Sequence, residues 1–556
     1  MALIGTKVRY SRGELAGAGN LCARLRRVTG RKKTQSLADG LGGVPSVTAD
    51  DPRQSGLRFA VQSSLNNRSH APGVAQLTNC TTTISRAQSS STHYAGSVTH
   101  NAEEFRRAGH QAVDWVADFL HDPRRYPVTP SVRPGELTDR LPALGPDTPE
   151  SLDAILRDFH DVIVPGATIW NHPRFLAYFA TTSSVPGIIA ELLSAALNSN
   201  GIHWHTSPAV TELEQVALGW LREWIGLPQS FFGIIYDTAS VSSLHAIAAA
   251  REMADPQVHS MGGSQDLTLY TSEQSHSSIE KAAIALGIGQ NNVRKVAADA
   301  EFRMGPEALE IEMARDRASN KRPFCVVATV GTTSSTSVDP VAAIVDVAAR
   351  YDAWVHIDAA YAGPAAILPE FRWILAGAER AHSIVINPHK WLFTPMDLSA
   401  FYTRRPDVLR RAFSLVPEYL QTPGDRRAVN LMDYGVPLGR RFRGLKLWFI
   451  LRYFGREGLQ AVLREHIGLA RRFADLVAAD ARFELAAPVI FSTVCFRLKE
   501  SDEANRRLLE RVNATHEVFL SHTVLNGKYT LRLAIGNLAT DESDILAAWR
   551  LLDSSV

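Results

Sequence analysis

Apolar residues recur at helical spacing directly after residue 100. The repeating positions are Phe105, Ala108, Ala112, Trp115, Val116 and Phe119. Steps of three and four residues place these side chains on one face of a helix, so the pattern predicts an amphipathic helix that begins near Asn101. Prolines follow at Pro123, Pro127, Pro130 and Pro134. They end this helix, and a second helical stretch is predicted from about residue 149 to 164.

Short runs rich in β-branched and aromatic residues alternate with helical stretches between residues 265 and 400. Strands are predicted at Leu267–Thr271, Phe324–Val330, Trp354–Ile357 and Ser383–Ile386. The intervening stretch Pro340–Tyr351 has a helical period and begins with a proline, as a crossover helix often does. This alternation predicts an α/β fold, in which a parallel or mixed sheet is covered by helices.

Polar side chains follow each of these predicted strands. His276 lies just after the first strand, the hydroxyl-rich stretch 332–335 after the second, and Asp358 after the third. The fourth strand is followed by Asn387 to Lys390. Because open α/β sheets bind ligands beyond the carboxyl ends of their strands, one site could hold a histidine, a carboxylate, an amine and several hydroxyl groups.

Composition separates the first hundred residues from the rest. The 556 residues include 59 Lys+Arg, 57 Asp+Glu and 45% hydrophobic residues, which is typical of a globular protein. Residues 1–100 carry 13 Lys+Arg and 4 Asp+Glu, are rich in Ser and Thr, and have no sustained period. We predict a mostly disordered extension over residues 1–100. An organelle transit peptide is an alternative interpretation of the same composition.

Charge and cysteine content restrict the partners. A formal net charge of +2 gives no general attraction for nucleic acid or an anionic membrane, so we expect a small-molecule substrate and neither of those partners. The sequence has no run of 18 apolar residues, and its four cysteines lie far apart. We therefore expect reduced cysteines and a cytoplasmic location. The motifs G-x-S-x-G and G-x-x-x-x-G-K-[ST] are absent, which argues against a hydrolase and an NTPase.

Lys390 is the strongest candidate for chemistry. It lies between an apolar strand and the stretch Trp391–Phe393, where loss of solvent would lower the pKa of an amine and make it nucleophilic. Pyridoxal phosphate needs a lysine for its aldehyde, a carboxylate for its pyridine nitrogen, a flat group against its ring and donors for its phosphate. Lys390, Asp358, His276 and the hydroxyl groups at the strand ends provide these types.

Several motifs resemble one enzyme family. They are NPHKWL at 387–392, SEQSHSS at 272–278, HIDAAYAG at 356–363 and PLGRRFRGLKLWF at 437–449. Over about residues 101 to 553 the chain resembles the group II pyridoxal-phosphate-dependent decarboxylases, the aromatic L-amino-acid decarboxylase family. The resemblance implies a fold-type I homodimer. Its parts would be an N-terminal helical segment (101–180), a large cofactor domain with a mixed seven-stranded sheet (181–444) and a small C-terminal α+β domain (445–556).

The resemblance also implies roles for individual residues. Lys390 would bind the cofactor aldehyde as a Schiff base, and Asp358 would pair with the ring nitrogen. Ala360 would pack beneath the ring and His276 would stack above it. The other implied cofactor contacts are Thr332, Ala239, Ser240, Ser383, Asn387 and His389. The implied substrate contacts are Trp170, Tyr178, Phe179, Thr181, Trp204, His389 and Gly439.

The implied reaction is decarboxylation of an aromatic L-amino acid, of the tryptophan, DOPA, tyrosine or phenylalanine type, to an amine and CO2. Tyr419, in the stretch 415–420, resembles the loop tyrosine linked to protonation of the product carbon. Relatives with phenylalanine at this position resemble aldehyde synthases. An aromatic aldehyde synthase is therefore one alternative, and a catalytically silent homologue that acts as a binding protein is another.

Some positions depart from the family pattern. Asp237, Val241 and His382 replace residues expected near the phosphate, and we expect Asp237 to point away from the site or to pair with Arg or Lys. His203 and His205 have the i, i+2 spacing of a possible metal pair, but no third ligand is evident, so no metal site is predicted.

Overall fold

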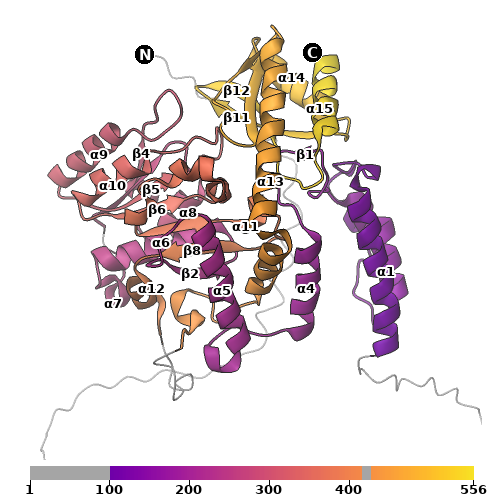
Figure 1. Cartoon of the computed structure of the whole chain (residues 1–556), viewed down its shortest axis with the longest axis horizontal. Helices are drawn as coiled ribbons and strands as arrows, with labels where there is room; N and C mark the ends of the chain where they lie inside the picture. The colour runs from indigo at the N-terminus through magenta and orange to yellow at the C-terminus, as the bar shows by residue number, and fades with distance from the viewer. Residues whose placement is uncertain (1–100, 264, 416–427) are drawn as a thin grey trace, which may run out of the picture. The chain divides into compact units, whose positions relative to one another are not determined.

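The computed structural model describes residues 101–263, 265–415 and 428–556 (Figure 1). The extension predicted over residues 1–100 and the candidate Tyr419 lie outside these ranges. The first described element is α1 (Ala102–His121), and the Asn101 side chain accepts hydrogen bonds from the backbone N–H groups of Glu103 and Glu104. This N-cap confirms the start of the predicted amphipathic helix.

A seven-stranded mixed sheet forms the centre of the larger part. Its strand order is β2-β8-β7-β6-β5-β3-β4. β8 is antiparallel to both of its neighbours, and the other pairs are parallel. The bounds are β2 (Phe232–Tyr236), β3 (Leu267–Ser272), β4 (Val293–Val296), β5 (Arg322–Thr329), β6 (Trp354–Asp358), β7 (Ser383–Ile386) and β8 (Ser399–Thr403). The predicted α/β class and mixed sheet are confirmed, and β3, β5, β6 and β7 coincide with the four predicted strands.

Alternate residues of these strands pack on opposite faces of the sheet. Val326 and Ala328 of β5 belong to a core with helices α5, α9, α10 and α13, whereas Cys325 and Val327 pack with α6, α8 and α12. Strands that are buried on both faces have continuous apolar sequences. These sequences differ from the helical pattern between them, so the alternation of strands and helices could be predicted. The helix bounds are α5 (Pro208–Trp224), α6 (Ala239–Ala254), α8 (Ser278–Ala285), α9 (Pro306–Ala318), α10 (Val341–Ala349), α12 (Pro406–Phe413) and α13 (Arg443–Ala479).

A smaller, five-stranded sheet has the order β1-β11-β12-β10-β9. Its first strand, β1, comes from the N-terminal part of the chain and pairs in parallel with β11. Helices α14 (Asp502–Asn513) and α15 (Glu542–Ser555) share its hydrophobic core. The strand bounds are β1 (Phe175–Leu176), β9 (Phe483–Leu485), β10 (Thr493–Leu498), β11 (Phe519–Leu525) and β12 (Lys528–Ala534).

Helix α13 joins the two sheets (Figure 1). Leu447 and Leu463 pack in the core of the large sheet, and Phe473 packs in the core of the small one. Gly455 interrupts the helical geometry with a left-handed φ of 62°, a conformation that glycine adopts without steric cost. The remaining helices are α2 (Glu136–Arg140), α3 (Leu152–Asp158), α4 (Val185–Leu197), α7 (Val258–Met261) and α11 (Pro388–Trp391). In the described ranges, none of the helices combines the length and the apolar character needed to cross a membrane.

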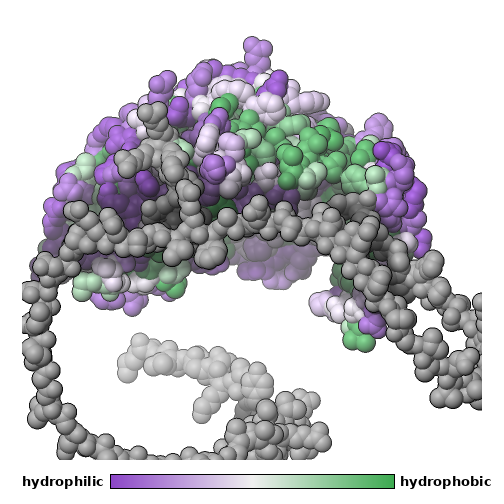
Figure 2. Space-filling view, turned by 90° about the horizontal axis from the view of Figure 1, so that it is seen from below, coloured by the Kyte–Doolittle hydropathy of each residue, from purple (hydrophilic) through white to green (hydrophobic). Residues whose placement is uncertain are grey.

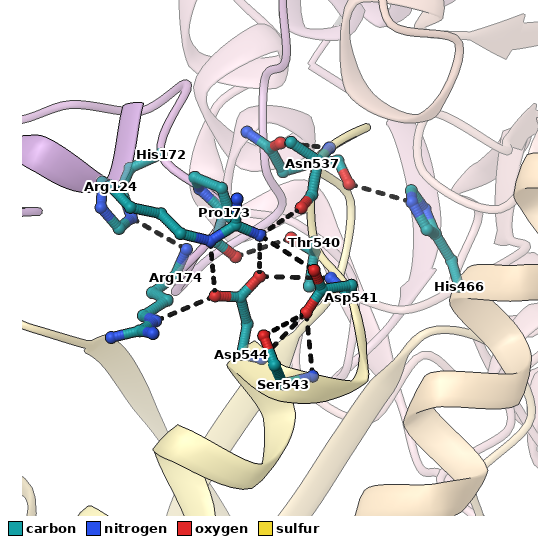
Figure 3. Close-up of polar contacts among 11 residues, drawn as sticks. Arg124, His172, Pro173, Arg174, His466, Asn537, Thr540, Asp541, Ser543 and Asp544 are labelled. Atoms are coloured by element: carbon teal, nitrogen blue, oxygen red, sulfur yellow. Dashed lines mark hydrogen bonds and ion pairs between the residues drawn. The ribbon is translucent and has the colours of Figure 1, made fainter. Parts of the chain in front are cut away.

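His466 of α13 connects the two parts through polar contacts. Its Nδ1 accepts a hydrogen bond from the indole N–H of Trp391 at 3.1 Å. Its Nε2 donates to the carbonyl oxygen of Asn537 at 3.0 Å, the contact drawn in Figure 3. This pattern requires a neutral imidazole, because a proton on Nδ1 would face the indole N–H. Burial lowers the pKa of His466 to about 4.

The pH dependence of stability follows from this lowered pKa. Between about pH 6.5 and pH 4 the unfolded chain binds a proton at His466 that the folded chain does not bind. The free energy of unfolding should therefore fall as the pH falls through this interval, by up to about 1.4 kcal/mol per pH unit for one group.

His466→Gln keeps a donor and an acceptor but cannot titrate. In urea unfolding from pH 7.5 to 4.5, this variant should lose stability less steeply with acid than the parent protein or His110→Gln, which changes an exposed residue. Equal slopes for all three would contradict the assignment.

Candidate active site

A pocket of about 330 Å³ lies where the carboxyl ends of β3, β5, β6 and β7 meet the start of α6. Its wall contains most of the residues predicted from the sequence. Those residues are Trp170, Tyr178, Phe179, Thr181, Ala239, Ser240, His276, Asp358, Ala360, Asn387, His389 and Lys390. The parallel strands bring His276, Asp358 and Lys390 together because their carboxyl ends meet at one edge of the sheet, whereas Trp170 to Thr181 come from the segment around β1.

Lys390 lies on the short helix α11, directly after β7. Burial lowers the pKa of its amine, the Arg532 guanidinium lowers it further, and Asp358 opposes both effects. The amine lies 5.1 Å from the centre of the Phe179 ring. A lowered pKa increases the fraction of neutral amine, which is the form that attacks an aldehyde.

Asp358 ends strand β6, next to β7 in the sheet. Its side chain is buried, and Oδ1 accepts a hydrogen bond from the backbone N–H of Ala360 at 3.1 Å. The carboxylate raises the pKa of Lys390 and of His276, so it acts electrostatically on both groups. A buried carboxylate of this kind can hold a positively charged ring nitrogen.

His276 follows β3, and its Nδ1 accepts the backbone N–H of Ser278 at 3.2 Å and contacts the Ser278 hydroxyl at 2.8 Å. These contacts leave the proton on Nε2. Burial lowers the pKa of His276, the Lys390 charge lowers it further, and Asp358 opposes them. A neutral imidazole therefore lines the pocket, and its flat face suits a ring.

The start of α6 supplies a binding place for a phosphate. Thr238, Ala239 and Ser240 line the pocket there, and the backbone N–H groups of a helix N-terminus bind anions. Oδ1 of Asn387 is buried and has no hydrogen-bond partner among the described residues. One pocket thus contains an amine, a carboxylate, a flat imidazole and an anion site. The Asn387 oxygen remains as an acceptor for a ligand. These residues fit pyridoxal phosphate.

Other predicted contacts do not line this pocket. Thr332 is buried, and its Oγ1 contacts the Ser335 hydroxyl at 2.9 Å and accepts the Ser337 N–H at 3.0 Å. Trp204 is 38% exposed, and its indole N–H donates to Glu212. Gly439 lies beside Asn200. Tyr419 lies outside the described residues.

Ser383 and His382 require a correction. Ser383 begins β7, and its hydroxyl contacts the Trp354 indole N–H and the imidazole of His356. Because each residue lengthens a strand by about 3.3 Å, Ser383 lies about 13 Å from Asn387, at the opposite edge of the sheet. His382 precedes it, and its Nδ1 accepts the backbone N–H of Val355. Neither residue lies in the pocket lining, so the cofactor contact predicted for Ser383 is wrong.

The departures at the start of α6 have a local explanation. The Asp237 carboxylate accepts hydrogen bonds from the backbone N–H and the hydroxyl of Thr238, and it lies outside the pocket lining. Within the described ranges it forms no ion pair, so of the two predicted alternatives the structure agrees with the first, in which Asp237 points away from the site. Val241 packs against the core on the α6 side of the sheet.

His203 and His205 have ring centres 6.4 Å apart. Among the described residues, no group of three or more His, Cys, Asp or Glu side chains could hold a metal.

Arg532 is a pocket residue that the sequence reasoning missed. It lies on β12 and is 4% exposed, and its guanidinium donates to the Ser334 carbonyl oxygen at 2.9 Å and the Ser521 hydroxyl at 3.3 Å. Its Nη2 has no hydrogen-bond partner in the described part of the chain. The signal in the sequence was an arginine inside an otherwise apolar strand, since charged side chains are seldom buried without a ligand or a partner.

Comparisons with known proteins agree with this site. The family model described as the pyridoxal-dependent decarboxylase conserved domain matches residues 134–499. Tyrosine decarboxylase 4 of Petroselinum crispum is 42% identical over 475 residues, which cover 82% of this chain and 93% of that protein. Phenylacetaldehyde synthase of Arabidopsis thaliana is 41% identical, over 81% of this chain and 96% of that protein.

A solved structure supports the same conclusion. The crystal structure of Oryza sativa TDC with PLP and tryptamine matches with a TM-score of 0.80 and 39% identity, and the match covers 82% of this chain and 98% of that one. The predicted fold-type I architecture and the predicted cofactor are thereby confirmed. The chain belongs to the pyridoxal-dependent decarboxylases, with pyridoxal phosphate as its cofactor.

Proposed function

We propose that this enzyme removes the α-carboxylate of an aromatic L-amino acid, of the tryptophan, DOPA, tyrosine or phenylalanine type, and releases the amine and CO2. The observation that carries the proposal is a single pocket in which Lys390, Asp358 and His276 meet a wall of aromatic side chains. Tyrosine decarboxylase among the relatives and tryptamine in the related structure support the aromatic class.

Bound pyridoxal phosphate supplies an electron sink for the pair of electrons that the departing CO2 leaves behind. The residues of the chain create the conditions for this chemistry. Lys390 offers an amine whose lowered pKa favours the neutral form, Asp358 would hold the protonated ring nitrogen, and the start of α6 would bind the phosphate. His276, whose Nδ1 contacts Ser278, would lie against the face of the ring.

Arg532 is proposed to bind the substrate carboxylate. Its guanidinium lies 5.2 Å from the centre of the Phe179 ring, and its unused Nη2 can donate to an anion. His389, which also lines the pocket, is proposed to approach the same carboxylate. Burial lowers the pKa of His389 to about 4, so the ring is neutral and adds no second positive charge.

The aromatic wall suits a flat substrate side chain. Phe179 stacks on Tyr361 with ring centres 3.9 Å apart, and Trp170 stacks on Tyr178 at 5.8 Å. Tyr178 is 52% exposed and Trp170 is 39% exposed, so both present ring area to the pocket mouth. Aromatic pairs contribute about 0.5–1.5 kcal/mol beyond simple burial. This contribution favours an indole or phenyl ring over an acidic side chain.

We also propose that the enzyme is a homodimer. Helix α4 exposes Val185, Ile189, Leu192, Leu193 and Leu197. A groove of about 770 Å³ with an almost wholly apolar lining lies between α1, α3 and α4, and Figure 2 shows apolar side chains gathered on one face. Exposed apolar patches of this kind mark protein interfaces. A second subunit could complete the pocket near Trp204 and Gly439, whose substrate contacts remain part of the proposal.

A cytoplasmic location is proposed on the state of the cysteines. Cys325 and Cys495 are buried free thiols, as expected in a reducing compartment. Burial raises the pKa of the Cys495 thiol to about 11, which keeps it protonated and unreactive.

The purified enzyme tests the proposed reaction. Incubated with pyridoxal phosphate, it should release equal amounts of amine and CO2 from at least one of tryptophan, DOPA, tyrosine and phenylalanine, and none from glutamate. Lys390→Ala should lower kcat at least about a thousandfold and abolish the visible absorbance of covalently bound cofactor, because no amine remains to attack the aldehyde. Lys446→Ala changes another buried lysine, and this variant should keep the cofactor absorbance if it folds. Release of CO2 from glutamate alone would refute the aromatic assignment.

Arg532→Gln should lower kcat/KM for the best substrate by about 10- to 100-fold, because a charge-assisted hydrogen bond is worth about 1.5–3 kcal/mol. Arg532→Lys should recover part of this loss. Steady-state kinetics measure both variants, and the matching amino-acid methyl ester, tested as a competitive inhibitor, provides the control because it has no carboxylate. If Arg532 binds the carboxylate, the substitution should leave the inhibition constant of the ester nearly unchanged. An equal loss of affinity for the ester would argue against the assigned role.

An aldehyde synthase is the second candidate, since phenylacetaldehyde synthase of Arabidopsis thaliana covers most of the chain. The tyrosine at position 419 favours amine release, because a phenolic proton can be delivered to the product carbon. Tyr419→Phe should divert product towards aldehyde, ammonia and hydrogen peroxide, with oxygen consumed. Chromatography of the products and an oxygen electrode measure this change. An unchanged amine yield in the variant would contradict the role assigned to Tyr419.

A further inference from the structure

A buried carboxylate outside the pocket joins two distant segments. Asp544, in the first turn of α15, is fully buried. Its Oδ2 accepts Nη2 of Arg124 at 2.7 Å, and its Oδ1 accepts Nε of Arg124 at 3.1 Å and Nε of Arg174 at 2.9 Å (Figure 3). The backbone N–H of Asp541 also donates to Oδ2 at 3.2 Å. The carboxylate is therefore held between two guanidinium groups and saturated with donors.

Arg174 directly precedes β1, the strand that leads into the pocket. Its backbone N–H donates to Nδ1 of His172 at 2.9 Å, and the hydroxyl of Thr540 donates to the carbonyl oxygen of Pro173 at 2.6 Å. Both contacts are drawn in Figure 3 beside the Asp544 ion pairs. The segment 172–174 is thus held against the start of α15 by its backbone as well as by the Arg174 side chain.

The same segment reaches the aromatic wall within a few residues. β1 pairs in parallel with β11, the backbone N–H of Tyr178 donates to the Ser521 hydroxyl at 3.1 Å, and the Thr182 hydroxyl donates to the carbonyl oxygen of Gly536 at 3.0 Å. Between these contacts lie Tyr178, Phe179 and Thr181, which line the pocket. Arg174 and Tyr178 are four positions apart in the sequence, with β1 between them, so displacement of Arg174 would act on the wall at Tyr178.

We propose that Asp544 is a positioning residue for substrate specificity: by holding Arg174 and Arg124 together, it fixes the aromatic wall at Tyr178 and Phe179. The inference rests on the proposed aromatic decarboxylation. Lys390, Asp358 and His276 come from other elements, at the edge of the large sheet. Asp544 therefore controls how well an aromatic side chain is bound, and it leaves cofactor binding unaffected.

Removal of the Asp544 charge should separate these two properties. Asp544→Asn removes the carboxylate that pairs with Arg174, whereas Arg124 keeps Asp541 at 3.3 Å and the carbonyl oxygen of Ala539, so Arg174 should be displaced. The expected result is a rise in KM of about tenfold or more for aromatic substrates, a kcat within about threefold of the parent value and unchanged cofactor absorbance. Glu542→Gln is the matched control in the same turn, because Glu542 is 55% exposed and pairs with Arg472 on the surface. This control should behave like the parent enzyme.

If Asp544→Asn does not fold, a second variant tests the same inference. Arg174→Gln removes one partner and leaves Asp544 paired with Arg124, and it should raise KM in the same direction. The kcat/KM ratio between tryptophan and phenylalanine should also change in each variant, because a displaced wall affects rings of different size unequally. Unchanged KM values in folded Arg174→Gln, or a loss confined to kcat with the same factor for every substrate, would overturn the inference. Failure of the proposed function would appear differently, as a parent enzyme that releases no amine from any aromatic amino acid.

Discussion

The proposed chemistry depends on an amine and a carboxylate that lie together in one partly buried pocket. β6 and β7 are parallel neighbours, so Asp358 at the end of one strand and Lys390 just beyond the other meet at the same edge of the sheet. Burial makes the neutral amine more favourable, while Asp358 favours the charged form. Burial is the larger effect, so the pKa of the amine is lowered and its nucleophilic neutral form is favoured beside a carboxylate that can hold a cationic ring.

The two sheets contribute different functions to this pocket. The large sheet supplies the groups that fit the cofactor, at the carboxyl ends of its parallel strands. The small sheet supplies Arg532 directly, and through the pairing of β1 with β11 it positions the aromatic wall. Helix α13 packs in both cores and so connects the two sheets that supply these groups.

The sequence predicted the features that have local patterns. The sequence shows apolar runs at β3, β5, β6 and β7, each followed by polar residues. These polar residues identified Lys390, Asp358 and His276 as candidates for the site. Arg532 was missed because its place in the pocket depends on pairing between strands far apart in the chain. The prediction for Ser383 was wrong because the family match shows only that Ser383 is close to Asn387 in the sequence. Ser383 begins a strand and Asn387 follows its end, so the two residues lie at opposite edges of the sheet. The domain boundaries at 101, 181 and 445 stay predictions.

The most direct test identifies the lysine that carries the cofactor. The parent enzyme, loaded with pyridoxal phosphate, is treated with borohydride so that the bond between cofactor and amine becomes stable, and its peptides are then mapped by mass spectrometry. We predict that the cofactor mass is found on the peptide that contains Lys390. Attachment at a different lysine, such as Lys446, or no attachment to a folded enzyme that turns over substrate, would contradict it.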